Sequence, residues 1–296
     1  MTYHTPVMLT ETLEYINVVS GGKYIDCTLG DAGHTLEILK KGGKVLGLDV
    51  NEKALQRATE RIKSAGFESN FIGVCKNFKH INNLAEQNGF SKVNGILFDL
   101  GYSSSQLADE ETGLSFLANQ PLDMRLDKEL GVTAADLVNA LSENDLAKMF
   151  LELSDEKFSK RFAKAITEHR NLKKFRTTKE LVDVVVSVAP PGYEHGRIHP
   201  ATRIFQALRI AVNAEIENLE VSLPRAAQTL LPGGRMIVIS FHSLEDRAVK
   251  SFGRTARLYM KELTDKPLTP SATEISANVR SRSAKMRVYE KIAAYA

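Results

Sequence analysis

The first hundred residues alternate between apolar runs of strand length and amphipathic stretches of helix length, and this alternation restricts the fold more than any other feature of the chain. Strands that alternate with helices need crossover connections, so the pattern predicts an α/β fold with a doubly wound parallel sheet. The fourth run, VNGILFDL, is apolar almost throughout, as expected for a strand covered on both faces. In chain order the predicted elements are strand 23–28, helix 34–41, strand 44–49, helix 52–65, strand 71–75, helix 81–88 and strand 93–100.

The alternation stops after the fourth predicted strand. From about residue 106 to residue 210 the apolar spacing is helical and strand signals are absent. Thr133 and Ser142 are suitable N-caps for two of the helices in this segment. The predicted helices cover 133–141, 143–153, 157–170 and 178–189.

Strand character returns towards the C-terminus. The breaker Pro232-Gly233-Gly234 precedes a predicted strand at 234–240, and a helix is predicted over 244–261. Residues 264–284 are rich in Pro, Ser and Arg and are expected to form an extended loop. A last strand is predicted at 286–292.

These segments predict two domains that differ in charge. One consists of residues 1–105 and 211–296, and a helical insertion domain at 106–210 interrupts it. Residues 1–150 carry 14 Lys and Arg against 20 Asp and Glu, and residues 151–296 carry 25 against 16. This asymmetry favours a small ligand for the front half and a polyanion for the basic half. A chance partition of solvated surface charge is the alternative.

Composition excludes several classes of protein. Of the 296 residues, 43% are apolar and 25% are charged, which is the balance of a folded chain rather than a disordered one. No apolar run reaches the roughly 18 residues of a membrane span, and the N-terminus does not resemble a signal peptide. Cys27 and Cys75 both fall in predicted strands, so we expect two buried thiols in a cytoplasmic protein.

The ends of the first two strands predict a cofactor site, because ligands of open parallel sheets bind beyond the carboxyl ends of the strands. A glycine turn, Gly30 to Gly33, follows the first strand, and Asp49 closes the second, where its carboxylate could accept both hydroxyls of a ribose. Asp26 and Asp31 would repel a pyrophosphate but favour a ligand with an ammonium and a sulfonium. This pattern indicates S-adenosylmethionine rather than NAD.

The ends of the third and fourth predicted strands carry two further candidate site residues. Phe78 follows the third strand and is either a ring that stacks on adenine or an ordinary core residue. Asp99 ends the apolar fourth strand, where a carboxylate without a function is uncommon.

The residues together resemble the bacterial ribosomal RNA small subunit methyltransferase H family, and the resemblance runs nearly from end to end. The motifs that carry it are His4-Thr-Pro-Val, Tyr24-Ile-Asp-Cys-Thr-Leu-Gly, Gly33-His34, Ile96-Leu-Phe-Asp-Leu-Gly, Gly113-Leu-Ser-Phe, Pro121-Leu-Asp-Met-Arg, His199-Pro-Ala-Thr-Arg, Phe205-Gln-Ala-Leu-Arg, Ser240-Phe-His-Ser-Leu-Glu-Asp-Arg and Arg280-Ser-Arg-Ser. The chain departs from the commonest family pattern at Asp31-Ala32 and at Ser105.

The resemblance implies a class I S-adenosylmethionine-dependent methyltransferase that modifies the N4 amine of a cytosine in 16S rRNA, within the small ribosomal subunit. The helical insertion would then recognise the substrate, and a homodimer is one expected form. The family's cofactor contacts map onto Ala32, Gly33, His34, Asp49, Phe78, Asp99 and Gln106.

Positioning of the amine, methyl carbon and sulfur would supply most of the rate, because the sulfonium already activates the methyl group. Asp99, with Ser103 close behind, is the candidate that steers the amine and receives its proton. His195 and His199 are four residues apart, but Gly196 and Pro200 argue against a helix that would bring them onto one face. No metal site is therefore expected.

Basic clusters in the second half suit RNA phosphates, although a solvated helix face would look the same. One cluster lies between Lys157 and Arg176. His242 is expected either to touch the base or to cap the following helix. The residues that we assign to RNA binding are His199, Arg203, His242, Arg280, Arg282 and Lys285.

Two alternatives stay open from the sequence. The first is a methyltransferase that acts on another RNA or DNA base. The second is a ribosome assembly factor that binds RNA and uses the cofactor only structurally. A nicotinamide oxidoreductase is disfavoured by the turn sequence GDAGH.

Overall fold

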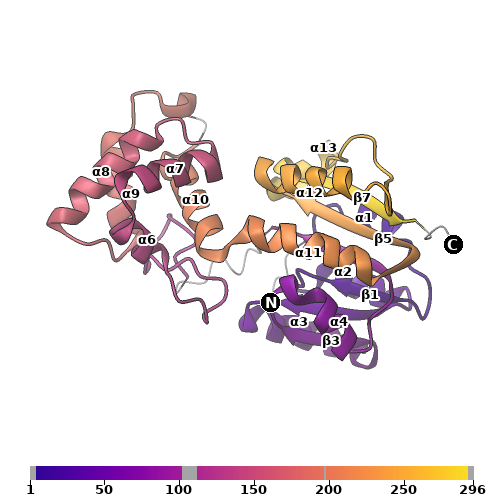
Figure 1. The fold of residues 1–296 in the computed structure, drawn as a ribbon. Helices are drawn as coiled ribbons and strands as arrows, with labels where there is room; N and C mark the ends of the chain where they lie inside the picture. The colour runs from indigo at the N-terminus through magenta and orange to yellow at the C-terminus, as the bar shows by residue number, and fades with distance from the viewer. Residues whose placement is uncertain (1–4, 102–111, 197, 293–296) are drawn as a thin grey trace. The chain divides into compact units, whose positions relative to one another are not determined.

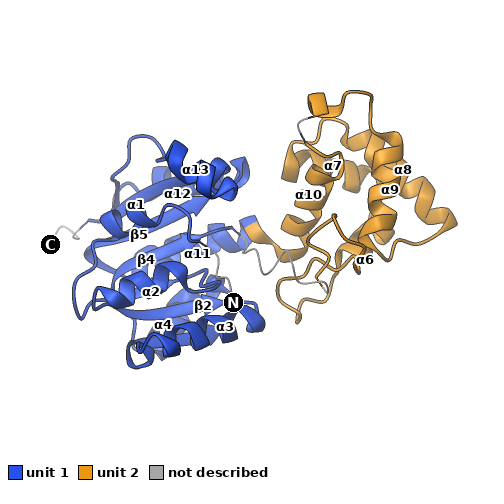
Figure 2. Cartoon of the chain, turned by 180° about the vertical axis from the view of Figure 1, so that it is seen from behind, with its two compact units in different colours: residues 1–103, 216–296 blue, residues 104–215 orange. Residues whose placement is uncertain are grey.

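The computed structural model describes residues 5–101, 112–196 and 198–292. The chain divides into two compact units, coloured separately in Figure 2. Unit 1 consists of Met1–Ser103 and Ile216–Ala296, and unit 2 consists of Ser104–Glu215. Within the described ranges, no helix is both long enough and apolar enough to cross a membrane.

Unit 1 is built on one seven-stranded sheet with the order β3-β2-β1-β4-β5-β7-β6 (Figure 1). The pairs from β3 through β5 are parallel, whereas β7 is antiparallel to β5 and β6 is antiparallel to β7. The predicted doubly wound α/β sheet is therefore confirmed, with two antiparallel strands added at one edge. The strands are β1 (Lys23–Asp26), β2 (Lys44–Asp49), β3 (Phe71–Cys75), β4 (Val93–Asp99), β5 (Leu230–Ser240), β6 (Met260–Glu262) and β7 (Lys285–Lys291).

Helices cover both faces of this sheet. Apolar side chains of α4 (Ile81–Gln87), α11 (Glu215–Thr229) and α12 (Ser243–Thr255) pack into one core, and those of α1 (Leu9–Ile16), α2 (Gly33–Lys40) and α3 (Glu52–Ser64) pack into the other. Strand β4 contributes to both, because Ile96 and Phe98 face the first core and Leu97 faces the second. All three side chains are fully buried, which explains the continuous apolar run in the sequence.

Strand β3 is less completely buried than β4, because it lies at the edge of the sheet and pairs only with β2. Cys27 is buried as expected, but the prediction of a buried thiol at Cys75 is wrong, since Cys75 is exposed. An edge strand has a neighbour on one side only, so its side chains are covered less completely.

The C-terminal segment differs from its prediction in three places. Strand β5 begins at Leu230, which pairs with Val93, and the chain then bulges through the Pro-Gly-Gly breaker before pairing resumes at Arg235. Helix α12 ends at Thr255, because the following segment pairs as β6 with β7. The expected extended loop contains α13 (Ala272–Ala277) and the 3₁₀ helix η4 (Val279–Ser283).

Unit 2 is helical, as predicted for the insertion. Thr133 and Ser142 cap the first two helices, each accepting a hydrogen bond from a backbone N–H in the first turn, so both predicted caps are confirmed. The core includes Phe150, Phe162 and Leu208. The helices are α6 (Ala134–Ala140), α7 (Glu143–Ser154), α8 (Ser159–Leu172), α9 (Thr178–Val188) and α10 (Ala201–Asn213).

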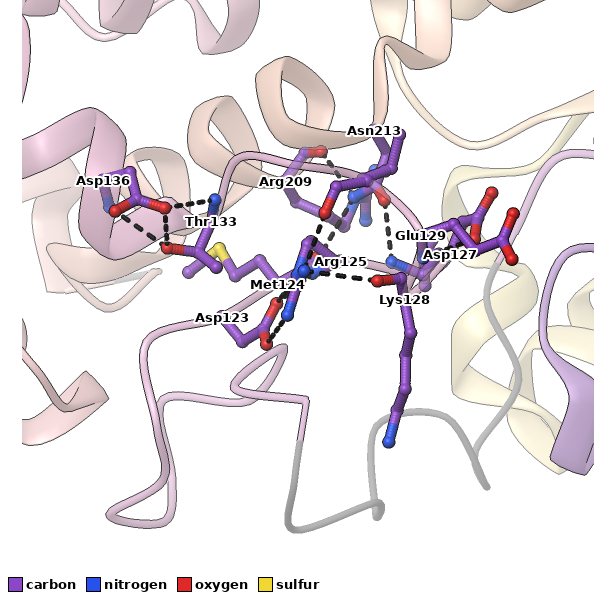
Figure 3. A network of polar contacts seen from close by, with 12 residues as sticks. Asp123, Met124, Arg125, Asp127, Lys128, Glu129, Thr133, Asp136, Arg209 and Asn213 are labelled. Atoms are coloured by element: carbon purple, nitrogen blue, oxygen red, sulfur yellow. Dashed lines mark hydrogen bonds and ion pairs between the residues drawn. The ribbon is translucent and has the colours of Figure 1, made fainter.

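A polar network holds the irregular segment before α6 (Figure 3). The Arg125 guanidinium donates from Nε and Nη2 to the two carboxylate oxygens of Asp123, at 2.7 and 2.9 Å, and from Nη1 to the Leu130 carbonyl. Asn213, at the end of α10, donates to the Met124 carbonyl and accepts from the Leu126 N–H, each at 2.8 Å. Met124 has a φ of 63° and is fully buried, so these bonds hold a backbone conformation that methionine rarely adopts.

We expect Asn213→Ala to lower the local opening free energy of segment 120–130 by about 1–3 kcal/mol, because the part-buried Leu126 N–H and the buried Met124 carbonyl would lose their partner. Hydrogen exchange with mass spectrometry measures this as faster exchange in that segment. Ser276→Ala, on the exposed surface of α13, is the control, and equal exchange in wild type and Asn213→Ala would contradict the prediction.

Candidate functional site

The strand order places the candidate site at the carboxyl edge of β2, β1 and β4. The order reverses at β1, whose neighbours β2 and β4 lie on opposite sides. Parallel register pairs Asp26 with Gly47 on one side and with Leu97 on the other, so the ends of these strands lie at one edge. A ligand crevice forms where such a sheet reverses its strand order.

Asp26 organises the turn that follows β1. Its carboxylate accepts from the Thr35 hydroxyl at 2.7 Å and from the Thr28 N–H at 3.2 Å. Burial raises the pKa of Asp26, and the Thr35 hydrogen bond opposes this effect. The side chain therefore ties the beginning of α2 to the end of β1, and it serves the site by holding the turn.

Two positions of the turn restrict which residue can occupy them. Ala32 is fully buried with a φ of 58°, a left-handed conformation in the bend before α2. A side chain at Gly33 would meet the Pro6 ring at 3.1 Å, so this position leaves little space beyond hydrogen.

Asp31 is placed differently from what its charge suggested. Its carboxylate lies 3.0 Å from Arg57 Nε of α3, and Arg61 donates to its backbone carbonyl at 2.7 Å. This ion pair offsets part of the negative charge, so Asp31 favours a cationic ligand less than an unpaired carboxylate would. The selectivity argument then depends on the other carboxylates of the site.

Asp49 closes β2 and is buried. One carboxylate oxygen accepts from the Gly30 N–H at 2.9 Å, and the other accepts from the Asn51 N–H at 2.8 Å. These bonds aim the carboxylate at the glycine turn and leave further lone pairs for ligand hydroxyls. Burial raises the pKa of Asp49 to about 6, although both backbone hydrogen bonds act to lower it.

His34 and Asp99 form the central pair of the site. His34 Nε2 lies 3.5 Å from Asp99 Oδ2, and the Asp99 N–H donates to the Thr28 hydroxyl at 2.6 Å. Asp99 Oδ1 and both His34 ring nitrogens are buried and have no hydrogen-bond partner among the described residues. Buried polar atoms without partners are rare in proteins and mark a place where a ligand is expected to bind.

Phe78 lies just beyond β3, at the start of the 3₁₀ helix η2 (Phe78–His80). Its ring meets Phe98 edge to face, with centroids 5.6 Å apart, and it is only partly buried against the core. Both interpretations from the sequence therefore retain support, because the ring packs on the core and keeps an accessible part. Ser103 and Gln106 lie outside the described residues.

The predicted RNA-binding residues of unit 1 gather beside a cavity. His242, Arg282 and Lys285 line it, whereas Arg280, in the same 3₁₀ helix as Arg282, does not. His242 is also the N-cap of α12, since its Nδ1 accepts from the Glu245 N–H at 3.5 Å. The structure thus supports the capping role that the sequence left as an alternative.

The two predicted residues of unit 2 have structural partners. Arg203 pairs with Glu194 at 3.0 Å and donates to the Asp155 carbonyl. The ring of His199 stacks on Phe116 with centroids 5.0 Å apart. In the basic cluster, Arg170 donates to two carbonyls at the end of α6, so it stabilises the unit as well as carrying charge.

Comparisons with known proteins identify the family. A family profile described as the MraW methylase family matches residues 1–292, and the chain belongs to this family. The ribosomal RNA small subunit methyltransferase H of Carboxydothermus hydrogenoformans is 43% identical, with 98% of each chain covered. The protein of the same name from Dehalococcoides mccartyi is 44% identical, over 98% of this chain and 86% of the relative. A solved rRNA methylase from Streptococcus thermophilus aligns over 99% of this chain and 100% of that chain, with a TM-score of 0.46 and 10% identity.

The raised pKa of Asp49 predicts how the free energy of unfolding depends on pH. Because its pKa is raised in the folded state, folding takes up a proton between about pH 4 and pH 6, and the stability that this uptake contributes is lost as pH rises through that window. We expect Asp49→Asn to gain about 2 kcal/mol relative to wild type between pH 4 and pH 7. Urea unfolding at several pH values measures this difference, with the exposed Asp183→Asn as control. Parallel pH profiles for wild type and Asp49→Asn would contradict the assignment.

Proposed function

We propose that the protein transfers a methyl group from S-adenosylmethionine to the N4 amine of a cytosine in 16S rRNA. The observation that carries the proposal is the His34–Asp99 pair between the start of α2 and the end of β4, whose buried atoms have no hydrogen-bond partner among the described residues of this member of a methylase family. The names of the relatives supply the ribosomal RNA substrate.

The residues at the strand ends fit the cofactor. The Asp49 carboxylate would accept the ribose hydroxyls, and the turn from Ala32 to His34 would contact the amino acid part. Phe78 would lie against the adenine, and Asp99 and Gln106 complete the proposed set. When bound, S-adenosylmethionine supplies a methyl group already activated by the sulfonium.

The protein must then orient the acceptor. The lone pair of a cytosine amine is conjugated with the ring, so the amine attacks only if it is held in line with the methyl carbon. Asp99 Oδ1 can accept an amine N–H, which turns the lone pair towards the methyl group. As the carbon–nitrogen bond forms, the bond between the methyl carbon and the sulfur would break, and the surplus proton of the cationic amine would pass to the Asp99 carboxylate. Ser103 remains the second candidate for steering the amine.

The RNA side of the proposal divides between the two units. His242, Arg282 and Lys285 of unit 1 would contact the RNA near the reaction site, and the target base would leave its stack to reach Asp99. Arg280 lies outside the cavity and would add only to the general positive field that attracts RNA. We assign substrate recognition to the helical insertion, with His199 and Arg203 as its contacts. The assembled small subunit in the cytoplasm is the proposed substrate.

Methylation of small subunits from a strain that lacks the enzyme tests the function directly. Nucleoside mass spectrometry should detect N4-methylcytidine after incubation with the protein and S-adenosylmethionine. Naked 16S rRNA in a parallel reaction tests whether the assembled subunit is required. Methylation at another base or on DNA, or no methylation at all, would refute the proposal.

We expect Asp99→Ala to fold and bind RNA as wild type does but to lose about 10²–10⁴-fold in kcat, because it removes the acceptor beside the amine. Cofactor affinity is measured separately by titration calorimetry, and rates are taken at saturating cofactor. Asp183→Ala, an exposed carboxylate on α9, serves as control. A wild-type rate in Asp99→Ala would remove Asp99 from the mechanism.

Cofactor binding should also depend on Asp49 protonation. Ribose hydroxyls donate to the ionised carboxylate, and its pKa of about 6 means that binding at lower pH must first remove a proton. We expect affinity for S-adenosylmethionine to fall up to about tenfold per pH unit below pH 6. Asp49→Asn should bind more weakly at pH 7 but with a flat profile between pH 5 and pH 7. A wild-type profile that stays flat over the same range would show that Asp49 does not hold the ribose.

A further inference from the structure

A cavity of about 290 Å³ lies in unit 1 between the start of α12 and the chain where η4 ends and β7 begins. Its size is close to the lower end of small-ligand sites, roughly 300 Å³, so it suits one nucleotide-sized group rather than a folded RNA element. The residues that line it and matter here are Phe241, His242, Ser243, Thr269, Arg282 and Lys285.

The cavity adjoins the end of β4, where Asp99 lies. Asp99 pairs with Ile239, and the next residue of β5, Ser240, pairs with Lys285 on the cavity wall. A side chain added at Gly101 would come within 2.8 Å of the Phe241 ring. Phe241 therefore packs against the chain two residues beyond Asp99, and the cavity is next to the proposed reaction site.

The walls of the cavity are cationic and hydroxylic. Lys285 Nζ lies 3.6 Å from Asp246, but Asp246 is also bound by Arg287 at 2.7 Å, so it offsets only part of the Lys285 charge. Arg282 is exposed and makes no ion pair or side-chain hydrogen bond with the described residues. The Thr269 hydroxyl adds a hydrogen-bond donor. Helix α12 begins at the cavity, where the Glu245 carboxylate accepts from the N–H groups of Phe241 and His242.

We propose that this cavity binds a phosphodiester that flanks the target cytidine, with Arg282 as the principal contact and Lys285 as the second. The inference rests on the proposed function, which it deepens by naming the part of the substrate that this surface holds. Anchoring the backbone beside Asp99 would position the extruded base without reading its sequence. Arg282 is the choice for principal contact because its planar guanidinium can bond two phosphate oxygens at once and no ion pair occupies it.

Arg280 provides a matched control, because it is an exposed arginine two residues away in the same 3₁₀ helix and does not line the cavity. Arg282→Ala and Arg280→Ala remove the same charge, so a difference between them reports the cavity and not the overall field. Both sites are exposed, and thermal unfolding of each variant checks that it folds as wild type does.

The probe is a single-stranded RNA of nine nucleotides with a central cytidine from the target sequence. A second RNA carries an uncharged methylphosphonate at the linkage on the 5′ side of the cytidine, and a third carries it on the 3′ side. Affinities for wild type and variants are measured at one fixed salt concentration, because phosphate contacts weaken steeply with salt.

We expect Arg282→Ala to weaken binding of the unmodified RNA about tenfold or more, and Arg280→Ala to weaken it far less. One of the two methylphosphonates should weaken RNA binding by wild type by a similar factor. It should leave binding by Arg282→Ala almost unchanged, since the two changes remove the same contact. In Lys285→Ala the effect of the same methylphosphonate should also shrink, but by less than in Arg282→Ala.

Four results would overturn the proposal. The first is an equal loss in Arg280→Ala and Arg282→Ala, and the second is a methylphosphonate effect that persists in full in Arg282→Ala. The third is competition by free cytidine monophosphate as strong as that of the unmodified RNA, which would assign the cavity to a free nucleotide. Methylation of small subunits with an unchanged KM in Arg282→Ala would also reject the cavity while leaving the proposed function intact. If the Arg282→Ala and methylphosphonate effects are coupled but small subunits are not methylated, the cavity proposal stands and the proposed function fails.

Discussion

The parallel register of β1 with β2 and β4 is the constraint on which the rest of the molecule depends. It brings Asp26, Asp49 and Asp99 to one edge of the sheet, although they are far apart in the chain. The Thr28 N–H and the Thr35 hydroxyl donate to Asp26, and the Thr28 hydroxyl accepts from the Asp99 N–H, so these bonds hold the turn after β1 against the strand ends. Because helices cover both faces of the sheet, packing on two sides holds the strand ends that carry these residues.

Placing carboxylates at a buried edge costs stability, and the chain limits that cost in different ways. Asp26 is committed to hydrogen bonds within the turn, and Asp31 is paired with Arg57. Asp49 keeps a raised pKa, and Asp99 keeps an oxygen without a partner among the described residues. Burial also raises the pKa of Asp26, but its carboxylate accepts hydrogen bonds within the turn, so Asp49 and Asp99 are the two whose unfavourable burial a bound ligand can relieve.

The departures from expectation have local physical causes. Charge counting along the sequence could not show that α3 supplies an arginine to Asp31, because that pairing depends on tertiary packing. The same limit applies to Arg203, whose guanidinium is engaged by Glu194, and to Arg170, which binds the end of α6. Composition also missed α13, since a Ser-rich segment with a single good cap, Ser271, resembles a loop.

The sequence by itself determined the α/β class, the helical insertion and the strand-end carboxylates, because apolar periodicity and breakers act locally and are visible in one dimension. It also carried the family motifs that the comparisons bear out. Only the tertiary structure decided which charges remain available, such as Arg282, and which are used for folding, such as Arg203. Pairing between distant segments sets those outcomes, since a side chain's partners depend on where the chain returns in space and not on its neighbours in sequence.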